Sequence, residues 1–329
     1  MHRRTTFGAV AGLALALAAG LPAAAQDAST AEQTVDVMNT LWGKHPGFRA
    51  NHAKGTVVEG SFTPSREAAT YSKASLFAGP TVPVTVRFSD ATGLPLIADG
   101  AKSANPHGLA VKFKLAEGGE MDVVVNALKY FPVATGEEFR DLLTAASRSK
   151  PDSPKPTPVE RFIAAHPAAG TAGSTAGTPS SLARQTFNGV NAFVLVDTAG
   201  KRQAFRWRFV PVAGEDLLTP EDAEKQAPGF LMDEIRARLA RTPVAYRVLA
   251  QLAQAGDATN DATKPWPDDR PTVEMGTLTL TKPVADSAEA EKALLFLPNA
   301  LADGVEVSDD PLIDARVQAY AVSFSRRQP

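Results

Sequence analysis

The chain has 329 residues, no cysteine and a formal net charge of −2. The lack of cysteine excludes disulfides, zinc–thiolate sites, iron–sulfur clusters, thiol nucleophiles and thiol-linked cofactors. The charge shows no basic excess, so we expect no nucleic-acid partner.

The N-terminus predicts a signal peptide over residues 1–25. A basic start, "HRR", precedes an apolar run over 7–21, and "AAA" supplies the small residues of a cleavage site. The run is too short to span a bilayer comfortably and no later run is long enough, so we expect no stable membrane insertion. We predict cleavage after Ala25, by the Sec or the twin-arginine route, and a periplasmic location.

After a short predicted helix over 31–41, strand patterns dominate from residue 52 to 133. "TVPVTVRFSD" alternates, with valines and Phe88 on one face and Arg87 and Ser89 on the other. "GLAVKFKL" alternates in the same way, and "MDVVVNAL" follows as a continuous apolar run. These three segments predict strands.

The second half of the chain mixes helices and strands. A Gly-, Ala- and Ser-rich stretch over 170–181 is expected to be a mobile linker. "GVNAFVLVD" and "RQAFRWRFVPV" predict a hairpin, "VEMGTLTLT" predicts another strand, and "YRVLAQLA" fits a strand or a helix. Helices are predicted over 136–147, 160–166, 220–226, 229–240, 287–296 and 310–325.

The chain after Ala25 is long enough for a large core, in one large domain or two small ones, and we expect a single domain over residues 26–329. Its roughly eight strands lack a regular βαβ rhythm. This pattern favours an α+β fold in which an antiparallel sheet closes into a barrel with helices packed outside.

The last predicted helix gathers four polar side chains. They are Arg316, Tyr320, Ser323 and Arg327. Their spacing of i, i+4, i+7 and i+11 places them on one helical face. A guanidinium one turn from a phenol favours the phenolate, a good ligand for ferric iron. The same stretch also fits a solvated basic face with Tyr320 as an ordinary aromatic, and "AYAVSF" alone fits a strand.

Three other residues raise separate questions. A buried Arg87 needs an anionic partner, which is either the carboxylate of a ligand or a cross-strand Asp or Glu. Asn126 ends an apolar run and is either a turn residue or a polar group in a pocket. His52 is either a structural hydrogen bonder or a reactive group. The remaining histidines show no metal-like spacing.

Five separated motifs together resemble the haem catalase superfamily. They are "RANHAKG", "VRFSD", "NPHGLAVKF", "MDVVVNALKYF" and "ARVQAY", in the family's order across most of residues 45–329. Within that superfamily, the chain resembles the short catalase-related peroxidases exported by bacteria. The resemblance implies an eight-stranded antiparallel barrel with non-covalently bound haem b.

On the distal side of the haem, the resemblance implies a peroxide-cleaving group. His52 matches the distal histidine, Ser89 the serine that hydrogen-bonds to it, and Asn126 the distal asparagine. The family's distal-side phenylalanines match Tyr130 (a departure), Phe131 and Phe139.

On the proximal side, the resemblance implies a tyrosinate ligand. Tyr320 matches the axial ligand of the iron, and Arg316 matches the arginine that pairs with its phenolate. Tyrosinate ligation stabilises ferric and higher oxidation states. The arginines that hold the haem propionates match Arg49, Arg87 and Arg327.

The implied reaction is cleavage of a hydroperoxide O–O bond. His52 would take a proton from the near oxygen and return it to the far one, while Asn126 donates a hydrogen bond. A second hydrogen peroxide as reductant would give catalase activity, and a small organic electron donor would give peroxidase activity.

Departures from full-length catalases favour the peroxidase. Asn51 stands where many catalases place a β-branched apolar residue that narrows the channel, and Asp90-Ala91 also differs. The chain ends nine residues after Tyr320, so the interlocked catalase tetramer is not implied. We expect a monomer or small homo-oligomer that reduces hydrogen peroxide or organic hydroperoxides, with weak catalase activity.

Two other functions stay open. A non-catalytic haem or lipid-binding barrel would bind its ligand without oxidising a donor. An isomerase of lipid hydroperoxides would rearrange its substrate without consuming a reductant.

Overall fold

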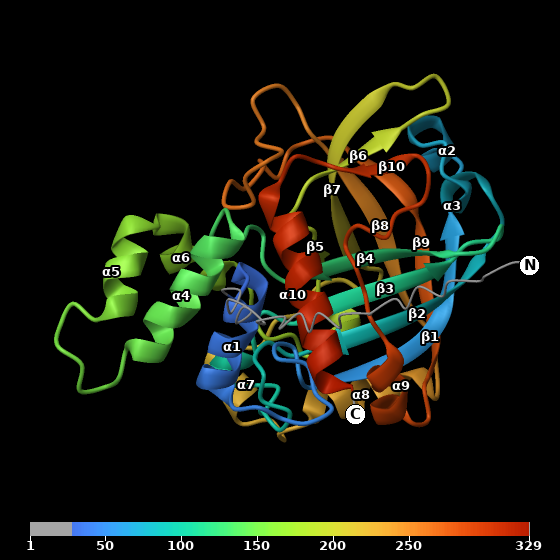
Figure 1. Ribbon diagram of the computed structural model, residues 1–329. Helices are drawn as coiled ribbons and strands as arrows, with labels where there is room; N and C mark the ends of the chain where they lie inside the picture. The colour runs from blue at the N-terminus through green and yellow to red at the C-terminus, as the bar shows by residue number, and fades with distance from the viewer. Residues whose placement is uncertain (1–27, 329) are drawn as a thin grey trace, which may run out of the picture.

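The computed structural model describes residues 28–328, and its centre is a β-barrel (Figure 1). Ten strands form one sheet. They are β1 (Gly55–Pro64), β2 (Val82–Ser89), β3 (Gly108–Lys114), β4 (Glu120–Asn126), β5 (Phe187–Asn188), β6 (Phe193–Val196), β7 (Arg202–Pro211), β8 (Val244–Leu252), β9 (Thr272–Pro283) and β10 (Val305–Val307). The predicted export signal lies outside the described residues.

The sheet closes on itself. Its order is β10-β6-β7-β5-β4-β3-β2-β1-β9-β8, and a further pairing of β7 with β8 joins eight of the strands into a ring. The pairings are antiparallel, and β6 and β10 extend the sheet beyond the ring. The predicted α+β fold with an eight-stranded antiparallel barrel is therefore confirmed.

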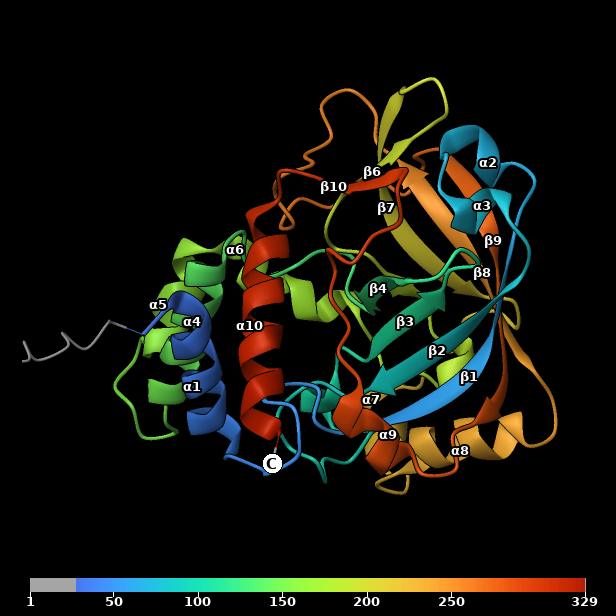
Figure 2. The ribbon, with the colours of Figure 1, turned by 45° about the vertical axis from the view of Figure 1, so that its right-hand side comes forward.

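Helices cover the barrel from outside. They are α1 (Thr30–Trp42), α2 (Ala68–Tyr71), α3 (Ser75–Ala78), α4 (Gly136–Arg148), α5 (Pro158–Ala165), α6 (Pro167–Thr171), α7 (Pro220–Glu224), α8 (Phe230–Leu239), α9 (Ser287–Ala293) and α10 (Pro311–Arg327). In both views α10 stands between the barrel and a layer made of α1 and α4 to α6, while α8 and α9 lie near one end of β1 (Figures 1 and 2).

Apolar side chains fill the inside of the barrel. Phe62 and Phe113 meet edge to face with ring centroids 5.2 Å apart, and Phe88 packs against Tyr246. Tyr246 is fully buried, and its hydroxyl donates to the backbone carbonyl of Leu182. Because small barrels are filled by their own side chains, polar groups gather at the strand ends and under the covering helices.

The structure decides two open points of the sequence analysis. The segment that fits either a strand or a helix is strand β8, with five consecutive buried residues at its end. The 170–181 stretch is not an unstructured linker. It contains the end of α6 and a 3-10 helix at Ala172–Thr175, and Asn105 donates to Thr178 across 2.8 Å. Within residues 28–328, no helix has the length and apolar character needed to cross a bilayer.

Candidate active site

The ends of three neighbouring strands bring predicted site residues into one row. In the sheet register, Ser89 at the end of β2 pairs with Gly108, and Gly108 pairs with Asn126 at the end of β4. His52 lies three residues before β1, and its Nδ1 is 3.1 Å from the Ser89 hydroxyl oxygen. A Cβ at Gly108 would stand 2.8 Å from that oxygen and 3.3 Å from His52 Nδ1. Glycine at this position therefore lets the imidazole lie against β3.

The backbone at His52 has an uncommon conformation. Its φ is 56°, and Thr92 has a φ of 76°, both in the left-handed region that few side chains adopt. The side-chain oxygen of Asn51 accepts from the backbone N–H groups of His52 and Thr92, each at 2.9 Å. Asn51 thus connects the backbone at His52 with the backbone at Thr92, a structural role that the sequence did not reveal. Backbone strain of this kind concentrates at functional sites.

The surroundings of His52 keep its imidazole neutral. Burial, and then the positive charge of Arg87, lower the pKa of His52 from 6.5 to about 3, with smaller contributions from Arg316 and Arg49. At neutral pH the ring is therefore a base. Its Nδ1 faces Ser89, which leaves Nε2 as the nitrogen that can exchange a proton with a substrate.

Asn126 has a turn function in this structure. Its side-chain oxygen accepts from the backbone N–H of Leu128 at 2.9 Å, and the residue is partly exposed. Of the two alternatives from the sequence, the turn is observed directly. The side-chain amide nitrogen stays available as a hydrogen-bond donor.

The aromatic residues of this region separate into two sets. The rings of Phe131 and Phe139 lie together, with centroids 5.4 Å apart and planes at 46°. Tyr130 instead donates its hydroxyl proton to Thr171 Oγ1 at 2.9 Å. Tyr130 is thus tied to α6 and does not join the phenylalanine pair.

Helix α10 carries the predicted proximal pair. Asp310 caps its first turn by accepting from Leu312 N at 3.0 Å, and Pro311 occupies the first helical position, where its missing N–H costs nothing. One turn separates Arg316 from Tyr320, and Arg316 Nε donates to the tyrosine hydroxyl oxygen at 3.1 Å. Both side chains are partly buried.

A chain of hydrogen bonds fixes the Arg316 guanidinium. It donates to the side-chain oxygen of Asn191 and, at 3.2 Å, to the backbone carbonyl of Val124 on β4. Asn191 in turn donates to Asp310 at 2.8 Å. The cap of α10, the barrel and Tyr320 are therefore connected through one arginine. Asn191 and Asp310 were not predicted from the sequence, although a polar residue before the apolar run "AFVLV" and an Asp-Pro pair before a helix were visible signals.

The three arginines predicted to hold propionates lie together beside α9. Arg49 and Arg87 both donate to the Glu291 carboxylate, and Arg49 and Arg327 both donate to the Leu294 carbonyl. We call Arg49, Arg87, Arg327 and Glu291 the arginine cradle. The anionic partner of Arg87 is thus a helix residue, neither of the two candidates considered from the sequence, and Glu291 was missed.

The arginine cradle has more positive charge than its own carboxylate neutralises. Burial and the neighbouring guanidiniums lower the pKa of Arg49, and burial lowers the pKa of Arg327 to about 10. The Nε of Arg327 is buried and has no hydrogen-bond partner among the described residues. Both observations are consistent with a bound ligand that carries carboxylate groups, such as haem with its propionates.

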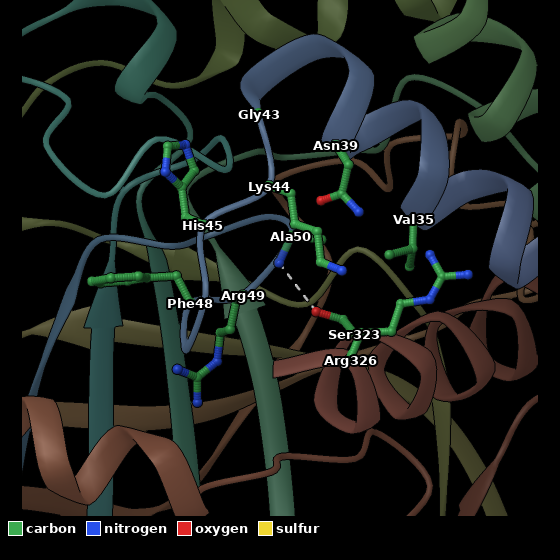
Figure 3. Close-up of a pocket in the computed structure, with 10 residues that line it drawn as sticks. All are labelled: Val35, Asn39, Gly43, Lys44, His45, Phe48, Arg49, Ala50, Ser323 and Arg326. Carbon is green, nitrogen blue, oxygen red and sulfur yellow. Dashed lines mark hydrogen bonds between the residues drawn. The ribbon is translucent and has the colours of Figure 1, made fainter. Parts of the chain in front are cut away.

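The loop before His52 docks on α10. Figure 3 shows a hollow between residues 43–50 and the end of α10, where Ala50 N donates to Ser323 Oγ at 3.1 Å. The side chain of Arg49 points away from those of Lys44 and Arg326, toward the arginine cradle. Ser323, on the same face as Tyr320, therefore positions the segment that carries His52.

Side chains that could ligate a metal ion are not clustered in the described part of the chain. Among residues 28–328, no three His, Asp or Glu side chains are grouped so that they could hold a metal ion.

Two solved catalases have a similar fold. A bacterial catalase superposes with a TM-score of 0.75 at 24% identity, over 86% of this chain and 58% of that one. A fungal catalase gives a TM-score of 0.75 at 21% identity, over 86% and 60%. These likenesses show the fold, and the chain spans less than two thirds of either catalase.

The sequence comparisons define the family. The family model described as "Catalase" matches residues 33–328. A catalase-related peroxidase of Synechococcus elongatus is 34% identical over 303 residues, 91% of this chain and 88% of that protein. One of Mycolicibacterium paratuberculosis is 34% identical over 302 residues, 91% and 95% of the two chains. The chain belongs to the catalase family.

Proposed function

We propose that the protein is a periplasmic haem b peroxidase that reduces hydrogen peroxide or organic hydroperoxides with a small organic electron donor. The observation that carries this proposal is a neutral His52 tied to Ser89 at the strand ends, combined with Arg316 bound to Tyr320 on α10. A binding protein has no need of a positioned proton acceptor. The two relatives named catalase-related peroxidases support the same activity.

The residues divide into those that hold the haem and those that move protons. Tyr320 would ligate the iron, with Arg316 holding its phenolate oxygen as an anion. When bound, the haem would supply the iron that accepts an oxygen atom from the peroxide. Arg49, Arg87 and Arg327 would hold its propionates, and Phe131 and Phe139 would pack on its distal side.

Proton transfer is the task of His52. Its Nε2 would take the proton from the peroxide oxygen nearer the iron and return it to the far oxygen, which leaves as water or an alcohol. The Ser89 hydroxyl fixes Nδ1 so that Nε2 faces the substrate. The side-chain amide of Asn126 would donate to the polarised peroxide oxygens. Substrate turnover then depends on an external organic donor.

One assay tests the proposal. Protein purified with haem should show a Soret band near roughly 400 nm, typical of ferric haem with tyrosinate ligation. Peroxide consumption should rise severalfold when an oxidisable phenol or dye is added. A protein that stays colourless with added hemin contradicts the proposal. Haem binding without donor oxidation indicates a carrier, and rearrangement of a lipid hydroperoxide without reductant indicates an isomerase.

The lowered pKa of His52 predicts an acid-resistant reaction with peroxide. The base is the neutral imidazole, which predominates above its pKa of about 3. The rate should stay level from pH 8 down to about pH 4 and fall below that, whereas an ordinary histidine would lose the base form below about pH 6.5. Stopped-flow measurement of the Soret change after peroxide mixing gives the profile. A decline of the rate centred near pH 6.5 would show that the pKa of His52 is not lowered in the protein.

Export is the remaining part of the proposal. The "HRR" start, the apolar run and "AAA" support cleavage after Ala25 and release into the periplasm. We propose a monomer or small homo-oligomer. Mass spectrometry of the mature protein from a periplasmic extract should give an N-terminus at Gln26.

A further inference from the structure

Glu291 stands among three guanidiniums and pairs with two of them. One carboxylate oxygen is 2.9 Å from Arg49 Nη1, 2.8 Å from Arg87 Nε and 2.7 Å from Arg87 Nη2. The Glu291 side chain is 14% exposed and that of Arg87 is 4% exposed, so solvent screens these charges little. Arg327 completes the group from α10 and has no carboxylate partner within the described residues.

Backbone carbonyls anchor the same arginines independently of Glu291. Arg87 Nη2 donates to the His52 carbonyl at 2.9 Å, and Arg49 Nη2 donates to the Leu294 carbonyl at 2.9 Å. Arg327 Nη2 donates to that carbonyl as well. Each guanidinium therefore has a fixed acceptor that is not Glu291. Glu291 therefore adds negative charge to the arginine cradle, but the arginines do not depend on it alone to hold their positions.

The charge of the arginine cradle has a definite value. Three guanidiniums and one carboxylate give 3 − 1 = +2. Two propionates carry −2 and balance it. Donor groups also remain for the propionates. Within residues 28–328, the buried Arg327 Nε has no hydrogen-bond partner, and the hydrogen bonds of Arg49 to Glu291 and Leu294 use Nη1 and Nη2 and leave Nε available. The cradle is thus matched to a tetrapyrrole with two carboxylates.

We propose that Glu291 is the resident counter-ion of this cradle. Its carboxylate stabilises the haem-free protein by separating Arg49 from Arg87, and it repels the incoming propionates, so it weakens haem binding. This inference rests on the proposed haem function. It makes Glu291 a positioning residue that sets cofactor affinity through charge, without touching a reacting atom.

The test is Glu291→Gln, which keeps the size of the side chain and removes its charge. The haem-free variant should have a lower Tm than the wild type, because Arg49 and the buried Arg87 lose the carboxylate with which they pair. The haem-loaded variant should lose haem about tenfold more slowly, a change that corresponds to about 1.4 kcal/mol. Haem loss is measured as transfer to excess apomyoglobin, starting from protein loaded in cells, so the variant need not be stable without haem.

Matched controls separate charge from packing. Glu289→Gln on the same helix, where Glu289 pairs only with exposed Lys292 at 2.6 Å, should change neither quantity. Glu291→Asp keeps the charge and should behave like the wild type. Haem dimethyl ester has no propionate charge, so Glu291→Gln should not slow its loss.

The outcomes distinguish this inference from the proposed function. A lower Tm together with slower haem loss supports the counter-ion. Faster haem loss would show that Glu291 organises the arginines, and unchanged haem loss would show that its charge is irrelevant; either result overturns the inference while the haem function stands. A wild-type protein that binds no haem overturns both.

Discussion

Haem retention is expected to fall by at least about 100-fold when Tyr320 is replaced by phenylalanine. The substitution keeps the ring and removes the oxygen that would bind iron and that accepts from Arg316 at 3.1 Å. Removing a residue that only supports a metal ligand typically costs about 10- to 100-fold in affinity, so losing the ligand itself should cost at least as much. Titration of haem-free protein with hemin, followed at the Soret band, measures the change.

Two further variants make this result specific. Tyr130→Phe removes a hydroxyl that donates to Thr171 and should leave haem retention unchanged. Arg316→Leu keeps Tyr320 but removes its hydrogen-bond donor, and it should lower haem affinity by about 10- to 100-fold. If Tyr320→Phe retained haem with the wild-type spectrum, α10 would not be the proximal face.

Most of the barrel could be predicted from local patterns. Strands β2 and β3 alternate in sequence with period two. Burial follows that alternation in β3 and in the first half of β2, whereas the last four residues of β2, Val86–Ser89, are all buried. The closure of the sheet into a barrel was harder to predict, because it depends on the pairing of β7 with β8 and on β5, a strand of two residues. A segment as short as β5 has no periodicity to detect. The strand β8 was ambiguous because a continuous apolar run suits a buried strand and a buried helix equally.

The motifs of the candidate site could be recognised in the sequence, but the residues that hydrogen-bond to them and hold them in place could not. Glu291 is 204 residues from Arg87, and Asn191 is 125 residues from Arg316. Such contacts depend on how α9, α10 and the barrel pack, and no local pattern encodes them. The positive φ of His52 was also not predicted, because histidine adopts such values more often than most residues but still only in a small minority of cases.

One side chain joins the two halves of the site. Arg87 donates to the backbone carbonyl of His52 and also to Glu291 in the arginine cradle. Its charge is the second largest reason, after burial, for the lowered pKa of His52. The residue proposed to seat a propionate therefore also keeps the proposed base neutral. Cofactor seating and proton transfer are coupled through Arg87.

The reaction of the haem-loaded protein with peroxide is expected to slow by about 100- to 10,000-fold when His52 is replaced, the usual contribution of a positioned acid–base group. Haem should be retained, because the imidazole contacts Ser89 and the bond from Arg87 of the arginine cradle goes to the backbone carbonyl of His52, which the substitution keeps. His52→Ala removes the base but also places alanine at a φ of 56°. Asparagine tolerates that region better, so His52→Asn separates the chemistry from backbone strain.

Stopped-flow mixing with peroxide measures the rate, and the Soret band of the resting protein confirms that haem is in place. His45→Ala is the matched control, since among the described residues the His45 imidazole hydrogen-bonds only with the Trp42 carbonyl, at 2.9 Å, and the variant should react at the wild-type rate. If both variants, His52→Ala and His52→Asn, slow the reaction equally, the lower rate is due to the missing imidazole, because that is the one change that the two variants have in common. A wild-type rate in His52→Asn would remove His52 from the mechanism, and the pH profile would then report another group.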